Sequence, residues 1–276
     1  MGMEQIIEKY FRPGRLPHIW CPGCSNGIVT SAIVKAIDKV GLDKDDTAIV
    51  SGIGCSSRAP GYLDFNTVHS AHGRALPFAT GIKLAKPEMN VLVVTGDGDC
   101  SAIGGNHLIH ACRRNIDLTA VVFNNNIYGM TGGQYSPLTP TNSKASTAPY
   151  RTIDRAFDLA KLATGAGATF VARATSFHAQ LLSDLIAQGI QHKGLSIIEA
   201  ICACPISYGR QNKMGDAPAM LKWQRDHAVM LAAYEKLSEE QRAEKFPIGV
   251  LHKEEQPEYT EEYSKIIAQA MAKEGK

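Results

Sequence analysis

An aspartate flanked by two glycines could place a hard anionic oxygen beside a bound metal ion. Gly96-Asp97-Gly98 follows one apolar run, residues 91–94, and Asn125 follows a second, residues 118–123. Carboxylate and amide oxygens are ligands that Mg²⁺ prefers, and glycine lets the backbone approach a ligand closely. These residues therefore suit Mg²⁺ that carries a phosphate group of a substrate or cofactor.

The polar residues that follow the two apolar runs must be brought together by secondary-structure elements. Short apolar runs that end in polar loops are typical of buried parallel strands, and the intervening residues 104–114 have a helical pattern. Ligands of a doubly wound α/β sheet bind beyond the carboxyl ends of its strands. We therefore predict a doubly wound, mostly parallel sheet with helices on both faces, in which Asp97 and Asn125 face one ligand.

The same alternation continues over most of the chain, and no break in composition requires a second domain. We predict one domain over residues 1–276, with an N-terminal arm and a C-terminal helical extension. Roughly the last 30 residues are expected to wrap a partner or to fray. Residues 135–150 should form a long ordered loop across the ligand face. The other expected helices cover residues 25–40, the run to Leu84, 152–162, 177–188 and 220–237, and the other expected strands cover 47–53, 169–173 and 195–202.

Five of the seven cysteines lie where chemistry is plausible. Cys21 and Cys24 form a CxxC pair just ahead of an expected helix, whereas Cys55 and Cys204 follow expected strands and Cys202 ends one. In an intracellular chain, cysteines are more often metal ligands, reactive thiols or buried residues than disulfides. A CxxC pair is compatible with a redox dithiol, a zinc knuckle or half of an iron–sulfur site.

Charge and hydropathy exclude two classes of partner. The net charge of +2 comes from interspersed acidic and basic residues, so no basic stripe is available for nucleic acid. The N-terminal residues 1–15 lack the apolar core of a signal peptide, and no apolar run is long enough to cross a bilayer. We expect a soluble, cytoplasmic protein that binds neither nucleic acid nor membranes.

Several motifs also resemble those of known families. GDG at 96–98, followed by NN after residues 99–123, resembles the thiamine diphosphate motif. GDGD, GGNHLIHACRRNID and NNNIYGMTGGQYSP resemble the β subunit of 2-oxoacid:ferredoxin oxidoreductases, and the similarity runs from about Phe11 to Asp226. HIWCPGCSNG and GGNHLIHACRRNID are more similar to the 2-oxoglutarate branch than to the pyruvate branch.

The resemblance implies a thiamine diphosphate-binding fold in which Mg²⁺ is held by Asp97, Asn125 and the main-chain carbonyl of Ile127. SAHGRALPFATGIKLA resembles the family's segment before GDGD. This similarity makes His72, rather than His69, the candidate catalytic residue. The expected cofactor-binding residues are Ile53, Gly54, Cys55, Ser56, His72, Gly73, Gly96, Asp97, Gly98, Asp99, Asn125, Ile127, Gly129, Met130 and Thr131.

The resemblance further implies a [4Fe–4S] cluster, which needs four thiolate ligands. Cys202 lies two residues before Cys204 and is the alternative to it, while zinc is the alternative metal. Cys100 and Cys112 match no ligand position, so we expect them to be small buried hydrophobic residues. The implied cluster ligands are Cys21, Cys24, Cys55 and Cys204.

The implied reaction is oxidative decarboxylation of a 2-oxo acid with coenzyme A (CoA), which gives acyl-CoA and CO₂. The similarity to the 2-oxoglutarate branch implies that the acid is 2-oxoglutarate. Electrons would pass through the cluster to ferredoxin. In this family the α subunit carries the glutamate that activates thiamine, so the chain should be active only with an α subunit. The alternatives are a non-oxidative thiamine decarboxylase or carboligase and a non-catalytic, zinc-stabilised subunit.

Overall fold

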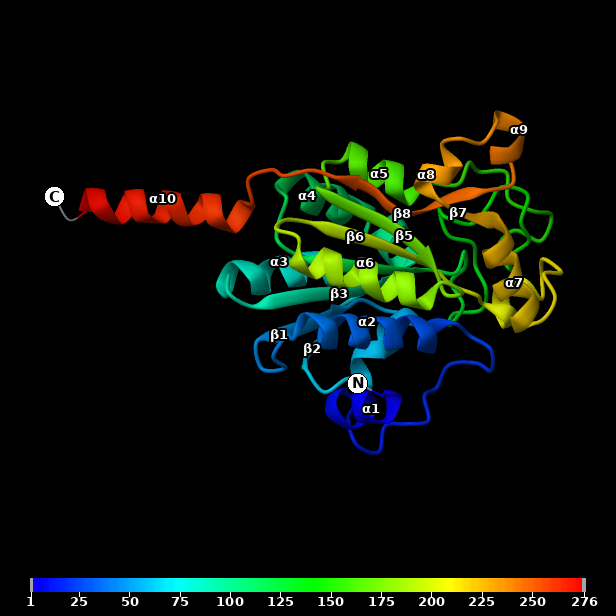
Figure 1. The fold of residues 1–276 in the computed structure, drawn as a ribbon, viewed down its shortest axis with the longest axis horizontal. Coiled ribbons are helices and arrows are strands. Elements are labelled where there is room, and N and C mark those ends of the chain that lie inside the picture. Colours follow the sequence, from blue (N-terminus) through cyan, green and yellow to red (C-terminus); the bar gives the residue numbers. More distant parts are fainter. Residues whose placement is uncertain (1, 275–276) are drawn as a thin grey trace.

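A computed structural model describes residues 2–274 of the chain. Its centre is an eight-stranded sheet (Figure 1). The strands are β1 Thr47–Ser51, β2 Asn66–His69, β3 Asn90–Gly96, β4 Thr119–Asn124, β5 Phe170–Thr175, β6 Ser196–Ile201, β7 Ala228–Met230 and β8 Phe246–Lys253. Their order is β2-β1-β3-β4-β6-β5-β8-β7. All neighbouring pairs are parallel except β5 and β8.

Helices cover both faces of the sheet, which confirms the predicted fold class. The α-helices are α1 Met3–Tyr10, α2 Asn26–Val40, α3 Ala75–Ala85, α4 Gly105–Arg114, α5 Leu159–Gly165, α6 Ala179–Gln191, α7 Ala217–His227, α8 Leu231–Tyr234, α9 Glu239–Arg242 and α10 Tyr259–Glu274. A 3₁₀-helix, η1 Ser56–Gly61, and two π-helices, η2 Asp99–Ile103 and η3 Pro205–Gly209, follow three of the strands.

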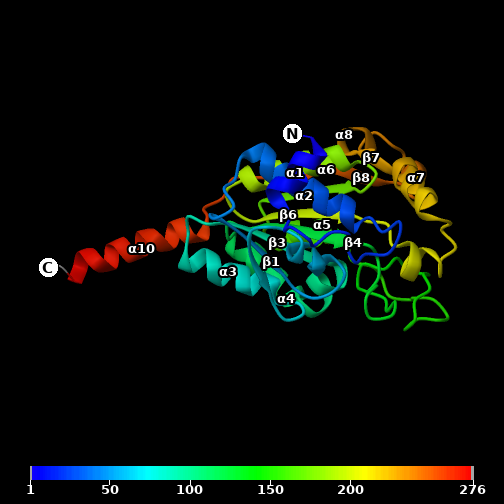
Figure 2. The same cartoon turned by 90° about the horizontal axis from the view of Figure 1, so that it is seen from below.

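The central strands are buried on both faces. Helices α1, α2 and α6 pack on one face, and α3, α4 and α5 on the other (Figure 2). Because side chains alternate along a strand, Leu92 and Val94 join the first core, while Val91 and Val93 join the second. This double burial explains the continuous apolar runs in the sequence.

One expected helix is wrong. Residues 152–158 continue the loop that follows β4, and α5 begins only at Leu159. Asp158 caps α5 by accepting hydrogen bonds from Ala160 N and Lys161 N. Upstream, Thr152 N donates to Ser143 O at 2.8 Å, and Ile153 is 92% exposed. The segment therefore has no apolar face to bury, and its backbone pairs with the loop instead.

Other expectations need correction at the two edges of the sheet. Asn66–His69 forms an edge strand that was not among the expected strands. The helix expected at 220–237 breaks at Ala228, where β7 pairs with β8. Phe246–Lys253 does not fray but pairs antiparallel with β5. Only α10 projects away from the body, as Figure 1 shows. Within residues 2–274, no helix combines the length and the apolar composition that a membrane span requires.

Candidate active site

One cavity lies beyond the carboxyl ends of β1, β3 and β4. Because these strands are parallel and adjacent in the sheet, the loops that follow them meet at one edge. Every residue predicted to bind the cofactor lines the cavity except Gly73, and Phe123 and Tyr128 line it in addition. The lining residues are Ile53, Gly54, Cys55, Ser56, His72, Gly96, Asp97, Gly98, Asp99, Phe123, Asn125, Ile127, Tyr128, Gly129, Met130 and Thr131.

Asp97 is a buried carboxylate without a cationic partner among the described residues. Burial raises its pKa to about 7, although hydrogen bonds from Ser136, Gly98 and Ile127 oppose this shift. Ser136 Oγ donates to Asp97 Oδ2 at 2.5 Å. A buried carboxylate that nothing neutralises favours a bound cation or a proton.

The other predicted Mg²⁺ ligands lie next to Asp97. Ile127 N donates to Asn125 Oδ1 at 3.2 Å, and the same N–H is directed at Asp97. The amide of Asn125 is buried. One unneutralised carboxylate beside an amide oxygen and a main-chain carbonyl is the hard-oxygen donor set that fits Mg²⁺.

Gly98 is required by the close approach of Tyr128. Tyr128 Oη donates to the carbonyl of Gly98 at 2.9 Å, and a Cβ on Gly98 would overlap the tyrosine ring. Burial, and then the charge of Asp97, raise the pKa of Tyr128 to about 12. The tyrosine therefore stays neutral and closes one side of the cavity.

His72 is oriented by the second aspartate of GDGD. Asp99, which is 3% exposed, forms a hydrogen bond with His72 Nδ1. It also accepts from Thr95 Oγ1 at 2.7 Å and from Gly73 N at 2.7 Å. The ring of His72 meets that of Tyr128 edge-on, with centroids 5.7 Å apart. Asp99 thus fixes the ring that lines the cavity and leaves Nε2 as the nitrogen able to face a ligand.

Gly73, which was predicted to bind the cofactor, and His69, the less favoured histidine, lie outside the cavity. Gly73 has a positive φ of 69°, and a Cβ there would come within 2.6 Å of Gly104 N. Gly73 therefore packs against the backbone of Gly104 and contacts Asp99 through its N–H, without lining the cavity. His69 belongs to a separate pocket, and its Nδ1 lies 2.6 Å from Ser51 Oγ. His72 therefore lines the cavity, whereas His69 does not.

The four cysteines predicted as cluster ligands lie in one region beside the cavity. A Cβ on Gly129 would lie 3.5 Å from Cys55 Sγ and 3.8 Å from Cys204 Sγ. Burial, and to a smaller extent the neighbouring Cys204, Cys55 and Cys21, raise the pKa of Cys24 to about 12. Burial, Cys204 and Cys21 raise the pKa of Cys55 to about 11. Each thiolate would repel the others unless a cationic group stood between them.

Hydrogen bonds tie the three cysteine-bearing segments together. Trp20 Nε1 donates to the carbonyl of Cys55 at 2.7 Å. Ser25, next to Cys24, donates its N–H to Ala203 O at 3.1 Å and accepts from Ala203 N through Oγ at 3.0 Å. The loop before α2 is therefore fixed to both the loop after β1 and the loop after β6.

Cys202 and Cys204 point into different surroundings. Cys202 lies in the core under α2 and α6, where its Sγ contacts Ala200 O at 3.1 Å. Cys204 packs with Ile127 in a small cluster near the cavity. Cys100 and Cys112 are buried in the opposite core, as expected. Cys24 and Cys55 also pack against the core that contains Cys202, but of Cys202 and Cys204 it is Cys204 whose sulfur lies with that of Cys55 beside Gly129.

The cysteine region fits an iron–sulfur cluster by its chemistry: four thiols from three segments lie together, and burial and the neighbouring thiols raise the pKa of Cys24 and of Cys55. Within residues 2–274, no three His, Cys, Asp or Glu side chains are spaced to bind a single metal ion. A tetrahedral zinc site needs all ligands about 2.3 Å from one ion. A four-iron cluster spreads its thiolate ligands over separate irons, so it tolerates sulfurs that are farther apart.

Sequence reasoning missed the residues that hold the site together. Ser136 binds Asp97 from 39 residues away, and Tyr128 and Trp20 act through the backbone of Gly98 and Cys55. Ser136 does lie in the loop that was expected to cross the ligand face. A polar side chain in that loop was the available signal.

Comparison with known proteins identifies the family. Residues 52–200 match the model of the thiamine pyrophosphate enzyme, C-terminal TPP binding domain. The chain is 51% identical to the 2-oxoglutarate synthase subunit KorB of Methanocaldococcus jannaschii, over 94% of this chain and 96% of that one. The KorB subunit of Archaeoglobus fulgidus is 57% identical over 74% of this chain and 76% of its own. The chain belongs to the KorB family of thiamine pyrophosphate enzymes.

A solved structure supports the same assignment. It is described as 2-oxoglutarate:ferredoxin oxidoreductase from Magnetococcus marinus with 2-oxoglutarate, coenzyme A and succinyl-CoA bound. The match has a TM-score of 0.80 and 30% identity, and it covers 96% of this chain and 90% of that one. Membership of the KorB family confirms the resemblance to oxidoreductase β subunits and the thiamine-binding α/β fold.

Proposed function

We propose that this chain is the β subunit of a 2-oxoglutarate:ferredoxin oxidoreductase and binds Mg²⁺-thiamine diphosphate and a [4Fe–4S] cluster. The overall reaction converts 2-oxoglutarate, CoA and two oxidised ferredoxins to succinyl-CoA, CO₂, two reduced ferredoxins and a proton. The observation that best supports this proposal is that Asp97 and Cys55 line one cavity. A metal–diphosphate site and a cluster ligand would then meet around one reacting centre.

The residues of the cavity have distinct roles in this proposal. Asp97, Asn125 and the carbonyl of Ile127 would hold the Mg²⁺ that carries the diphosphate. Thiamine diphosphate, when bound, supplies a nucleophilic carbon that releases CO₂ from a 2-oxo acid and keeps the bonding electron pair. His72, oriented by Asp99, holds or transfers a proton at its Nε2.

The cysteine region supplies the route for electrons. Cys21, Cys24, Cys55 and Cys204 would bind the cluster, and Cys55 would also border the thiamine cavity. One-electron transfers through a cluster match a two-electron oxidation to ferredoxin, which accepts single electrons. The position of Cys204 beside Cys55 at Gly129 supports Cys204 as the fourth ligand.

An α subunit completes the site. The cavity lining includes the partly exposed apolar residues Ile53 and Met130, which are 39% and 48% exposed. Covering them would exclude water from the reacting centre. We place this complex in the cytoplasm, with the chain acting as one domain and ferredoxin docking near the cysteine region.

Two other functions are less well supported. A non-oxidative decarboxylase or carboligase would use the same Mg²⁺ site but has no need for four cysteines beside it. A zinc-stabilised, non-catalytic subunit does not require those cysteines to border a cavity lined by Asp97. The position of Cys55 in both regions favours the oxidoreductase.

Co-purification with the α subunit tests the proposed function. The anaerobic complex should reduce ferredoxin with 2-oxoglutarate in a CoA-dependent reaction, and more slowly with pyruvate or branched-chain 2-oxo acids. The isolated chain should show no turnover. Turnover by the isolated chain, or CoA-independent release of aldehyde without ferredoxin reduction, would favour the carboligase.

A further inference from the structure

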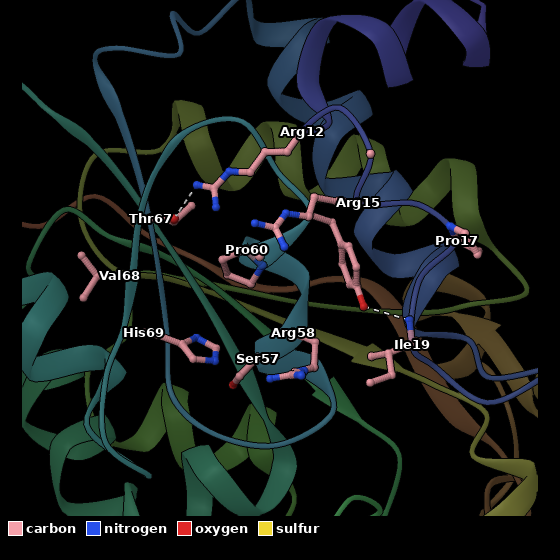
Figure 3. A pocket seen from close by; sticks show the side chains of 13 residues that line it. Arg12, Arg15, Pro17, Ile19, Ser57, Arg58, Pro60, Thr67, Val68 and His69 are labelled. Carbon is pink, nitrogen blue, oxygen red and sulfur yellow. Dashed lines mark hydrogen bonds between the residues drawn. The ribbon is translucent and has the colours of Figure 1, made fainter.

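A second pocket lies at the β2 edge of the sheet and holds about 670 Å³. The N-terminal arm, residues 12–19, forms one wall, and η1 and β2 form the others. Figure 3 shows guanidinium groups of Arg12, Arg15 and Arg58 around it. No acidic side chain is among its described lining residues. The pocket is therefore cationic and has a volume typical of small-molecule sites.

The arginines are available for a ligand. Arg12 Nη2 donates to Thr67 Oγ1 at 2.8 Å, which fixes this side chain against β2 (Figure 3). Arg15 and Arg58 are exposed, and neither has an ion pair or side-chain hydrogen bond with another described residue. Asp64 lies near Arg12 but pairs with Lys44 at 2.6 Å. Two guanidinium groups thus stand unpaired beside a third that is held in place.

The arm that forms this wall is tied to the body. Arg12 N donates to Tyr62 O at 2.8 Å, and Ile19 N donates to Tyr62 Oη at 2.8 Å. Pro17, Ile19 and Pro60 add apolar surface around the charged groups. Such a wall suits a ligand that has both anionic groups and a flat apolar part.

The pocket shares η1 with the candidate active site. Cys55 and Ser56 line the active cavity, whereas Ser57 and Arg58 line the pocket. Cys55 and Arg58 are one 3₁₀ turn apart, or about 6 Å along the axis. Burial, and then the charge of Arg58, lower the pKa of His69 on the pocket's far wall. A ligand with a long flexible arm could occupy the pocket and reach the active cavity past η1.

We propose that this pocket binds the phosphate groups of CoA, with Arg12, Arg15 and Arg58 as their partners and the apolar wall beside the adenine ring. The assignment rests on the proposed function, in which CoA is the acyl acceptor. Guanidinium groups bind phosphate oxygens through paired hydrogen bonds. The 2-oxo acid is a small molecule that would fill a minor part of this volume, whereas CoA carries several phosphates and a thiol on a long arm.

The test uses the complex with the α subunit and steady-state kinetics with CoA and with 3′-dephospho-CoA. Arg15→Gln should raise the KM for CoA by about tenfold, the usual effect of losing one charge-assisted hydrogen bond. Arg12→Gln/Arg15→Gln should raise it further. The KM for 2-oxoglutarate should not change. Arg113→Gln, at an exposed position on α4 outside the pocket, is the matched control and should match wild type.

The analogue identifies the contact. Wild type should have a higher KM for 3′-dephospho-CoA than for CoA. If Arg15 binds the 3′-phosphate, the Arg15 variant should lose part of this difference. If Arg15 binds the diphosphate, the variant should keep the difference while the KM rises for both thiols. An unchanged KM for both thiols would overturn the proposal, as would a rise confined to 2-oxoglutarate. Loss of the α subunit on purification would assign the arginines to protein docking instead. Absence of CoA-dependent turnover in wild type would contradict the proposed function itself.

Discussion

Ser136 donates a 2.5 Å hydrogen bond to the buried carboxylate of Asp97. The contact joins the long loop after β4 to the turn after β3. Leu138 N also donates to Ser136 Oγ, at 3.2 Å, so the serine is itself held by its loop. The loop therefore positions the carboxylate oxygen that we propose as a Mg²⁺ ligand and covers it from solvent.

This relationship predicts that Ser136→Ala weakens Mg²⁺-thiamine diphosphate binding by about tenfold, because one hydrogen bond that orients Asp97 is lost. Ser146→Ala, at an exposed position of the same loop, should have no effect. Calorimetric titration of the two variants measures the difference. Equal affinity in both variants would show that the loop does not position the aspartate.

Asp97→Asn should abolish Mg²⁺-thiamine diphosphate binding but stabilise the cofactor-free chain. The raised pKa of Asp97 means that the folded state binds its proton more tightly than the unfolded state. Burial of the charged carboxylate therefore lowers the free energy of unfolding. This loss of stability is absent below the unfolded-state pKa, grows as pH rises, and is complete above about pH 7, where it is on the order of 3 to 4 kcal/mol. Thermal unfolding at pH 8 should give a higher Tm for Asp97→Asn than for wild type. A lower Tm would mean that the carboxylate is neutralised by another group.

Asn125→Ala should weaken cofactor binding less than Asp97→Asn does. The asparagine supplies a neutral oxygen, whereas Asp97 supplies the anionic one. Comparison of the two dissociation constants at one Mg²⁺ concentration tests the order. A larger loss in the asparagine variant would reverse the assigned roles.

Cys204→Ser should remove the iron–sulfur cluster, whereas Cys202→Ser should leave iron and sulfide content near wild type. Cys204 lies beside Gly129 with Cys55, but Cys202 is packed in the core. Iron and sulfide analysis of anaerobically purified variants measures this. Similar loss in both variants would mean that the fourth ligand was assigned to the wrong cysteine.

Gly98→Ala should impair folding or cofactor binding, because its Cβ would overlap the ring of Tyr128. Overpacking of this kind costs about 1 to 3 kcal/mol. Gly105→Ala, where a Cβ meets nothing within 4 Å at the start of α4, is the matched control and should be neutral or slightly stabilising. Urea unfolding of both variants gives the comparison.

The sequence predicted which residues gather at the carboxyl edge of the sheet, because the signals for that edge are local. The apolar runs of β3 and β4 end directly at Asp97 and Asn125, so strand, turn and ligand lie within a few residues of each other. Ser136 could not be found in this way, since its partner is 39 residues distant. Only the folded loop brings the two together.

The errors arose where local pattern and tertiary packing disagree. The short strand β2 is half-exposed at the sheet edge and lacks the apolar run that marks the central strands. Residues 152–158 have helix-compatible composition, but Thr152 bonds across the loop and Asp158 caps the later helix. At residue 228 the pairing of β7 with β8 overrides the helical pattern.

The most direct test is the visible absorbance of the anaerobic complex with its α subunit when 2-oxoglutarate is added. If thiamine diphosphate at Asp97 and a cluster at Cys55 share one reacting centre, the substrate should bleach the iron–sulfur band in wild type. The same addition should leave Asp97→Asn unchanged, although that variant keeps its iron. An unbleached wild-type complex with full iron and thiamine content would contradict the account.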